Sequence, residues 1–168
     1  MNIVIRNEQN SDIEAIFALT ERAFSTMSYS SHTEQFIVNA LRDTGKLSIS
    51  LVALEDDQLV GHIAVSPVQL SNAELGWYAG GPLSVLPEKQ NMKIGTKLVF
   101  VAIEQLKKMQ VKGCVLVGDP NYYQRFGFKP STDLIYPDLP AEYFQVLAFN
   151  EVIPKATVQF DPAFLATA

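Results

Sequence analysis

Cysteine is nearly absent from this sequence, since Cys114 is the only one among 168 residues. A single thiol cannot form a disulfide within the chain, and this absence predicts a protein of a reducing compartment. No apolar run approaches the roughly 20 residues needed to cross a bilayer. The chain is already polar by residue seven, too early for the hydrophobic segment of a signal peptide. We therefore expect a cytoplasmic protein with no membrane partner.

Positive charge is also scarce, with 13 Lys and Arg against 18 Asp and Glu and a net charge of −5. An acidic chain repels the phosphates of nucleic acids, so we expect no nucleic-acid partner. The hydrophobic fraction of 48% is that of a globular domain. A chain of this length folds as one domain without a disulfide or metal, and we expect no metal site. A homodimer is possible, because dimers are common among soluble proteins.

The periodicity of apolar residues predicts alternating strands and helices. Strands are expected over residues 2–6, 48–54, 59–70, 76–86 and 113–118, with strand-like pieces near 144–149 and 155–160. Pro67 predicts an irregularity in the strand 59–70. Helices are expected over 11–25, 33–43 and 94–110. Asp119 and Pro120 predict the start of a further short helix that ends at Gly127. This order indicates a mixed α/β fold.

The segment from Pro82 to Thr96 runs from a strand through a loop directly into the helix 94–110. The first N–H groups of a helix lack partners within the helix, and together with the helix dipole they attract anions. The segment is therefore a candidate site for a phosphate-bearing ligand. A strand–loop–helix connection is a weak signal by itself, because many such connections bind nothing.

The loop sequence Gln90-Asn91-Met92-Lys93-Ile94-Gly95 resembles the Gln/Arg-x-x-Gly-x-Gly/Ala loop of the GNAT superfamily of N-acetyltransferases. The first and last positions match, but Lys93 stands where the family has its middle glycine. Glycine permits backbone angles and a close approach that a side chain hinders. Lys93 therefore either adds a positive charge for the phosphates or weakens their binding to the backbone of the loop.

A second segment carries the same resemblance. Residues 118–128 read GDPNYYQRFGF and resemble the family's short helix with the pattern Tyr-x-x-x-Gly-Phe, matched here by Tyr123, Gly127 and Phe128. A phenol close to a leaving thiolate can protonate it as a general acid, and the resemblance implies this role for Tyr123. Without the loop, Tyr122 and Tyr123 would be interpreted as packing residues with one polar end.

The resemblance extends over most of the chain. Residues 59–63 (LVGHI) look like the family's third strand, and the segment 118–128 with the tail 153–164 is similar to a branch of small bacterial members. It implies a mixed, mostly antiparallel twisted sheet of about seven strands, splayed between the fourth and fifth, with about four helices. In a single domain 1–168, residues 1–75 would form the acceptor side, 76–128 the acetyl-CoA-binding core and 129–168 the C-terminal strands.

The implied activity is transfer of an acetyl group from acetyl-CoA to a primary amine of a small molecule or protein, directly within a ternary complex. The backbone N–H of Val85 is the implied contact of the thioester oxygen, with a further main-chain contact at Leu83. The full set of implied cofactor-binding residues is Leu83, Ser84, Val85, Gln90, Asn91, Met92, Lys93, Ile94, Gly95, Thr96, Asn121 and Tyr123.

The base that deprotonates the amine is open between Glu34, Glu74, His62 and water. His62 has a suitable intrinsic pKa, although a histidine within a strand is more often structural. Cys114 lies in an apolar strand and is interpreted as a small hydrophobic residue rather than an acyl carrier.

Two other functions compete with the enzyme. The replacement at Lys93 supports a catalytically weak, GNAT-like module that binds acyl-CoA for regulation. The third possibility is a regulator that binds another nucleotide. The sequence lacks the Lys-Ser/Thr that follows the glycine-rich loop of ATPases.

Overall fold

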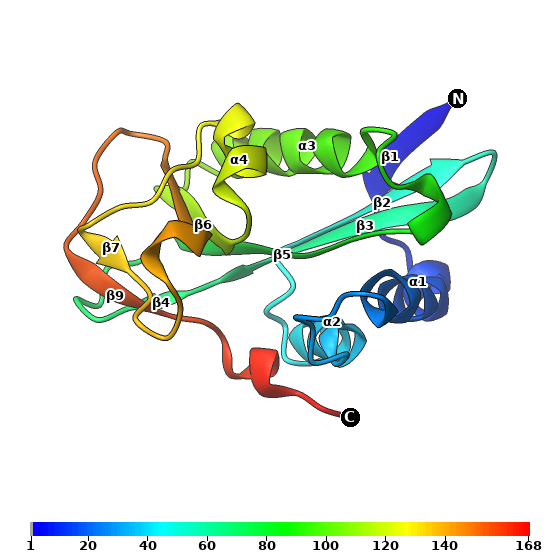
Figure 1. Ribbon diagram of the computed structural model, residues 1–168, viewed down its shortest axis with the longest axis horizontal. Helices are drawn as coiled ribbons and strands as arrows, with labels where there is room; N and C mark the ends of the chain where they lie inside the picture. Colours follow the sequence, from blue (N-terminus) through cyan, green and yellow to red (C-terminus); the bar gives the residue numbers. More distant parts are fainter. Residues whose placement is uncertain (1) are drawn as a thin grey trace.

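The structure is a computed structural model that describes residues 2–168. A twisted central sheet separates two layers of helices (Figure 1): α3 (Ile94–Lys108) and α4 (Pro120–Tyr123) cover one face, and α1 (Ile13–Ser25) and α2 (Glu34–Asp43) cover the other. The mixed α/β fold predicted from the sequence is confirmed. None of the helices within residues 2–168 combines the length and the apolar character needed to span a membrane.

The main sheet has six strands in the order β1-β2-β3-β5-β6-β8. All neighbours are antiparallel except β5 and β6, which are parallel. The strands are β1 (Ile3–Asn7), β2 (Ile49–Glu55), β3 (Gln58–Pro67), β5 (Trp77–Val85), β6 (Gly113–Val117) and β8 (Phe144–Ala148).

A second, three-stranded sheet has the order β4-β9-β7, with β4 (Gln69–Leu70), β9 (Ala156–Gln159) and β7 (Leu134–Ile135). Residues 2–168 thus form nine strands in two sheets where the resemblance implied about seven. The irregularity predicted at Pro67 is confirmed, because the predicted strand 59–70 divides there into β3 and β4. Proline has no N–H to continue a ladder, and the chain passes to the second sheet two residues later.

The parallel strands β5 and β6 separate after a short contact. In β5, Trp77, Tyr78 and Ala79 pair with β6, whereas Gly80 and residues 83–85 pair with β3 alone. A register shift marks the divergence, because Ile63 pairs with Leu83 while Val65 pairs with Gly80. The extra residue on β5 forms a bulge at Gly81 and Pro82, joined by a cis peptide bond. Strands β5 and β6 are the fourth and fifth strands of the main sheet, so their separation is the expected splay.

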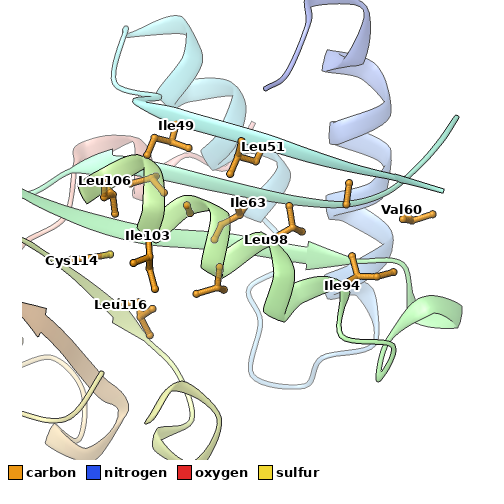
Figure 2. Close-up of a cluster of buried hydrophobic side chains, with 14 of the residues drawn as sticks. Ile49, Leu51, Val60, Ile63, Ile94, Leu98, Ile103, Leu106, Cys114 and Leu116 are labelled. Carbon is orange, nitrogen blue, oxygen red and sulfur yellow. The ribbon is translucent and has the colours of Figure 1, made fainter. Parts of the chain in front are cut away.

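The largest core cluster lies between α3 and the main sheet (Figure 2). Leu98 and Leu106 of α3 are fully buried and face Leu51 and Ile63 of the sheet. A Cβ added at Gly61 of β3 would lie 2.9 Å from Ile94 Cγ2, so glycine is what allows α3 to approach the sheet this closely. This packing fixes the start of α3 beside the splayed half of β5.

Candidate functional site

A groove of about 430 Å³ opens at the N-terminus of α3, along the splayed half of β5. Its lining joins that strand, the loop that follows it, the α1–α2 connection and α4. The lining residues are Met27, Leu83, Val85, Lys89, Gln90, Asn91, Lys93, Ile94, Gly95, Thr96, Tyr122 and Arg125. Most of the residues predicted to hold a cofactor therefore meet in one place.

Four predicted residues lie outside this lining. Ser84 is buried and its side chain points to the opposite face of β5 from Leu83 and Val85, since side chains alternate along a strand. Met92 and Asn121 are solvent-exposed. Tyr123 lines a separate inner cavity.

The loop is left-handed at the position where the family motif has its middle glycine. Lys93 is the N-cap of α3 and has a φ of 66°, in the left-handed region that glycine favours. Asn91 has a φ of 64°, which asparagine tolerates better than most residues. A Cβ added at Gly95 would lie 3.6 Å from Leu83 and Tyr122, an ordinary van der Waals distance, so alanine would also fit here as the family motif allows.

The groove carries positive charge and free helical N–H groups. No carboxylate in the described part of the chain forms a salt bridge with Lys93 or Arg125, whereas Lys89 Nζ lies 2.6 Å from Glu55 Oε1. Helix α3 contributes the positive end of its dipole at the same point. The arrangement is suited to a phosphate-bearing ligand.

Tyr122 is a groove residue to which the sequence analysis gave no role. Its hydroxyl lies 2.9 Å from Thr96 Oγ1. The guanidinium of Arg125 stacks on the Tyr122 ring at 4.4 Å, and Arg125 Nε donates to the Tyr122 carbonyl at 2.8 Å. These contacts hold Arg125 at the groove wall. Met27 was also missed, because nothing in its local sequence separates it from any other loop residue.

The inner cavity lies beneath α3, where β5 and β6 separate. It measures about 20 Å³, room for about one water molecule. Its lining includes Gly80, Leu83, Cys114 and Tyr123, and Leu83 also lines the outer groove. Burial and the neighbouring Tyr122 raise the pKa of Tyr123 above its ordinary value. Tyr123 is thus protonated at neutral pH, as a proton donor must be.

Cys114 stays a thiol in this cavity. Burial raises its pKa to about 12, and the side chain is 3% exposed. The thiolate is the nucleophilic form, so the environment matches the sequence interpretation of a small hydrophobic residue.

None of the three predicted base candidates lines the groove or the inner cavity. The Glu34 carboxylate accepts a hydrogen bond from Ser30 Oγ at 2.7 Å. Glu74 accepts one from Trp77 Nε1 at 3.2 Å and pairs with Lys112 at 3.1 Å.

His62 is fully buried and part of a polar network on the α1–α2 side of the sheet. Its Nε2 lies 2.8 Å from Ser50 Oγ, which donates to Glu8 Oε1 at 2.6 Å. A carboxylate only accepts, so the Ser50 proton faces Glu8 and His62 Nε2 carries the proton donated to Ser50. Burial lowers the pKa of His62 to about 4, opposed by the charge of Glu8. The imidazole is therefore neutral, and it lines neither the groove nor the inner cavity.

Comparison with known proteins identifies the family. Residues 4–131 match the family model described as an acetyltransferase (GNAT) domain. The chain is 34% identical over 128 residues to the N-acetyltransferase YhbS of Escherichia coli K12, a match that covers 76% of this chain and 74% of YhbS. The chain therefore belongs to the GNAT acetyltransferase family, and the resemblance drawn from the two motifs is confirmed.

Solved structures of relatives have the same fold. A GNAT family acetyltransferase from Brucella melitensis, in complex with acetyl-CoA, is 45% identical with a TM-score of 0.87, and the match covers 97% of this chain and 98% of that one. The structure of E. coli YhbS in complex with CoA is 29% identical with a TM-score of 0.85, covering 100% of this chain and 94% of that one.

Proposed function

We propose that this protein transfers the acetyl group of acetyl-CoA to a primary amine, directly within a ternary complex. The observation that carries the proposal is a pair of adjacent spaces that share a wall. Leu83 lines both an outer groove suited to phosphates and an inner cavity that is also lined by the protonated Tyr123. The 45% identical Brucella protein in complex with acetyl-CoA supports the choice of donor.

The residues present fit the pyrophosphate of coenzyme A. The first N–H groups of α3 have no partners within the helix, and the residues that carry them, Ile94, Gly95 and Thr96, line the groove. Lys93 and Arg125 add two positive charges at the rim. The left-handed conformation of Lys93, which glycine favours, supports a phosphate-binding loop at this position despite the missing glycine.

The splayed half of β5 fits the pantetheine arm. Leu86 N–H donates to Val60 O of β3 at 3.0 Å. By the alternation of an antiparallel ladder, the main-chain groups of Leu83 and Val85 face the other edge, which β6 leaves unpaired. Gln90 Nε2 donates to the Val85 carbonyl at 3.2 Å, in agreement with this direction. The Val85 N–H is then placed to stabilise the thioester oxygen as it gains negative charge.

The reaction forms a C–N bond between the amine nitrogen and the carbonyl carbon and breaks the C–S bond to coenzyme A. Tyr123 gives its phenolic proton to the leaving sulfur and is reprotonated from water. No carboxylate or imidazole lines the groove or the inner cavity within residues 2–168. We therefore assign the amine proton to water rather than to Glu34, Glu74 or His62.

Ligand binding and turnover test the proposal separately. Acetyl-CoA at about 100 times its dissociation constant should stabilise the fold by roughly 2.7 kcal/mol, and ATP at the same concentration should not. With a panel of amines, thiol release should fall by about 100-fold or more in Tyr123→Phe while acetyl-CoA affinity is retained. Absence of stabilisation by millimolar acetyl-CoA would refute the proposal.

A second candidate is an acyl-CoA-binding module with little turnover. The lack of a side-chain base in the lining favours it. It predicts the same stabilisation by acetyl-CoA with no thiol release that depends on both Tyr123 and an added amine.

A further inference from the structure

Gly118 follows β6 directly and lies against the ring of Tyr123. A Cβ added at Gly118 would lie 2.8 Å from Tyr123 Cδ2, 3.3 Å from Cζ and closer still to Cε2. Real Cβ atoms do not approach ring carbons so closely, so any side chain at position 118 would displace the ring.

Space, not backbone conformation, is the requirement at this position. Gly118 is not among the glycines with a positive φ, which include Gly127 a few residues later. An alanine could adopt the backbone of Gly118 without strain. The demand for glycine comes from the neighbouring ring alone.

The backbone of Gly118 is fixed by a hydrogen bond, and the Tyr123 ring is packed against other aromatic rings on the sides away from the inner cavity. Gly118 N–H donates to the Tyr143 carbonyl at 2.8 Å, which fixes the backbone to the start of β8. The Tyr123 ring is held on other sides by Tyr122, with centroids 4.9 Å apart, and by Phe126 and Phe128, each at 6.0 Å. The Tyr123 ring thus packs against Gly118 on one side and against three aromatic rings on others.

We propose that Gly118 is a positioning residue for Tyr123: because Gly118 has no side chain, the Tyr123 ring packs against the backbone at the end of β6 and lines the inner cavity. The inference rests on the proposed function for its catalytic consequence, because Tyr123 is the proposed acid. The geometric part concerns only the ring and is open to a test that needs no turnover.

The catalytic test uses Gly118→Ala. We expect turnover to fall at least about tenfold, as proton donation requires hydrogen-bond reach. The KM for acetyl-CoA should stay within about twofold, since Gly118 does not line the outer groove. Leu41→Ala is the control: Leu41 is fully buried in the separate α2 cluster, so this variant loses stability without touching Tyr123. In the Tyr123→Phe background, Gly118→Ala should cause a smaller loss of turnover. An equal loss in both backgrounds would overturn the proposal.

The geometric test compares the near-ultraviolet circular dichroism of each protein with that of its own Tyr123→Phe partner at neutral pH. The difference reports the packing of the Tyr123 ring, which lies among Tyr122, Phe126 and Phe128, and Gly118→Ala should change it. If the wild type turns over no amine but Gly118→Ala still changes this difference spectrum, the proposed function fails while the positioning stands. An unchanged difference spectrum would overturn the positioning.

A stability cycle covers the case in which Gly118→Ala does not fold. In the Tyr123→Ala background the ring is absent, and Gly118→Ala should then leave the unfolding midpoint unchanged within error. The same loss of stability with and without the ring would overturn the inference.

Discussion

The hydroxyl oxygens of Tyr122 and Thr96 lie 2.9 Å apart and join α4 to the first turn of α3. Tyr122 and its neighbour in the chain, Tyr123, face different spaces. Tyr122 lines the outer groove, whereas Tyr123 lines the inner cavity. Substitutions at the two positions should separate binding of the donor from the chemical step.

Tyr122→Phe removes the contact to Thr96 and leaves the ring in place. We expect the affinity for acetyl-CoA to fall by at most about fivefold, because the groove wall loses an internal hydrogen bond that stabilises it by about 1 kcal/mol. The kcat at saturating acetyl-CoA should change little. Calorimetric titration and steady-state kinetics give the two quantities, and Tyr123→Phe is the control with the opposite pattern. A fall in kcat with unchanged affinity would contradict the division of roles.

The sequence predicted those parts of the site that depend on neighbours in the chain. The loop, the start of α3 and the capping of α4 by Asp119 follow from local residue chemistry. The Thr96–Tyr122 contact joins residues 26 positions apart, and Met27 comes from a different layer of the fold. Local periodicity carries no signal for such contacts. The two-residue strand β7 was missed for a related reason, since only its pairing with β9 defines it.

Lys93 adopts a left-handed backbone conformation at the position where the family loop has its middle glycine. A residue with a Cβ in the left-handed region costs roughly 1–2 kcal/mol relative to its usual conformation. Lys93→Gly should therefore raise the unfolding temperature by about 2–4 °C for each kcal/mol relieved. The same change removes a cation from the groove, so acetyl-CoA affinity should fall and depend less on salt.

Lys93→Ala separates these two effects. It removes the charge but keeps the Cβ in the left-handed conformation, so it should lose affinity as Lys93→Gly does and gain no stability. Thermal unfolding and acetyl-CoA titrations at two salt concentrations measure both. Wild-type affinity in Lys93→Ala at low salt would show that the charge does not contribute to binding.

The N-cap residue Asp119 stabilises the start of α4, the helix that carries Tyr122 and Tyr123. Asp119 Oδ1 accepts a hydrogen bond from the Asn121 N–H at 2.9 Å, as the sequence predicted. Asp119→Ala should destabilise the protein by about 1 kcal/mol, which corresponds to a fall of about 2–4 °C in unfolding temperature. Asp119→Asn keeps a capping oxygen and should retain most of that stability in the same thermal scan. Equal losses in the two variants would exclude capping as the cause.

The buried His62 should make the protein sensitive to acid. Its pKa is about 4 in the fold against an ordinary value of 6.5, mainly because burial disfavours the charged ring. Glu8 and Asp12 oppose this lowering and Arg42 adds to it. Between these two pH values the unfolded chain binds a proton that the folded chain does not. The stability from His62 is thus complete above pH 6.5 and is lost as the pH falls to about 4.

The lost stability amounts to about 3 kcal/mol at most, from 1.36 kcal/mol per unit of pKa. Urea unfolding at pH 7 and pH 4.5 should show it in the wild type. His62→Gln removes the titrating group, and its amide can still donate to Ser50, so its stability should change less between the two pH values. Glu8 and Asp12 have lowered pKa values, and their contributions are lost mainly at more acidic pH in both proteins. The same pH dependence in wild type and His62→Gln would show that His62 is not the acid-sensitive group.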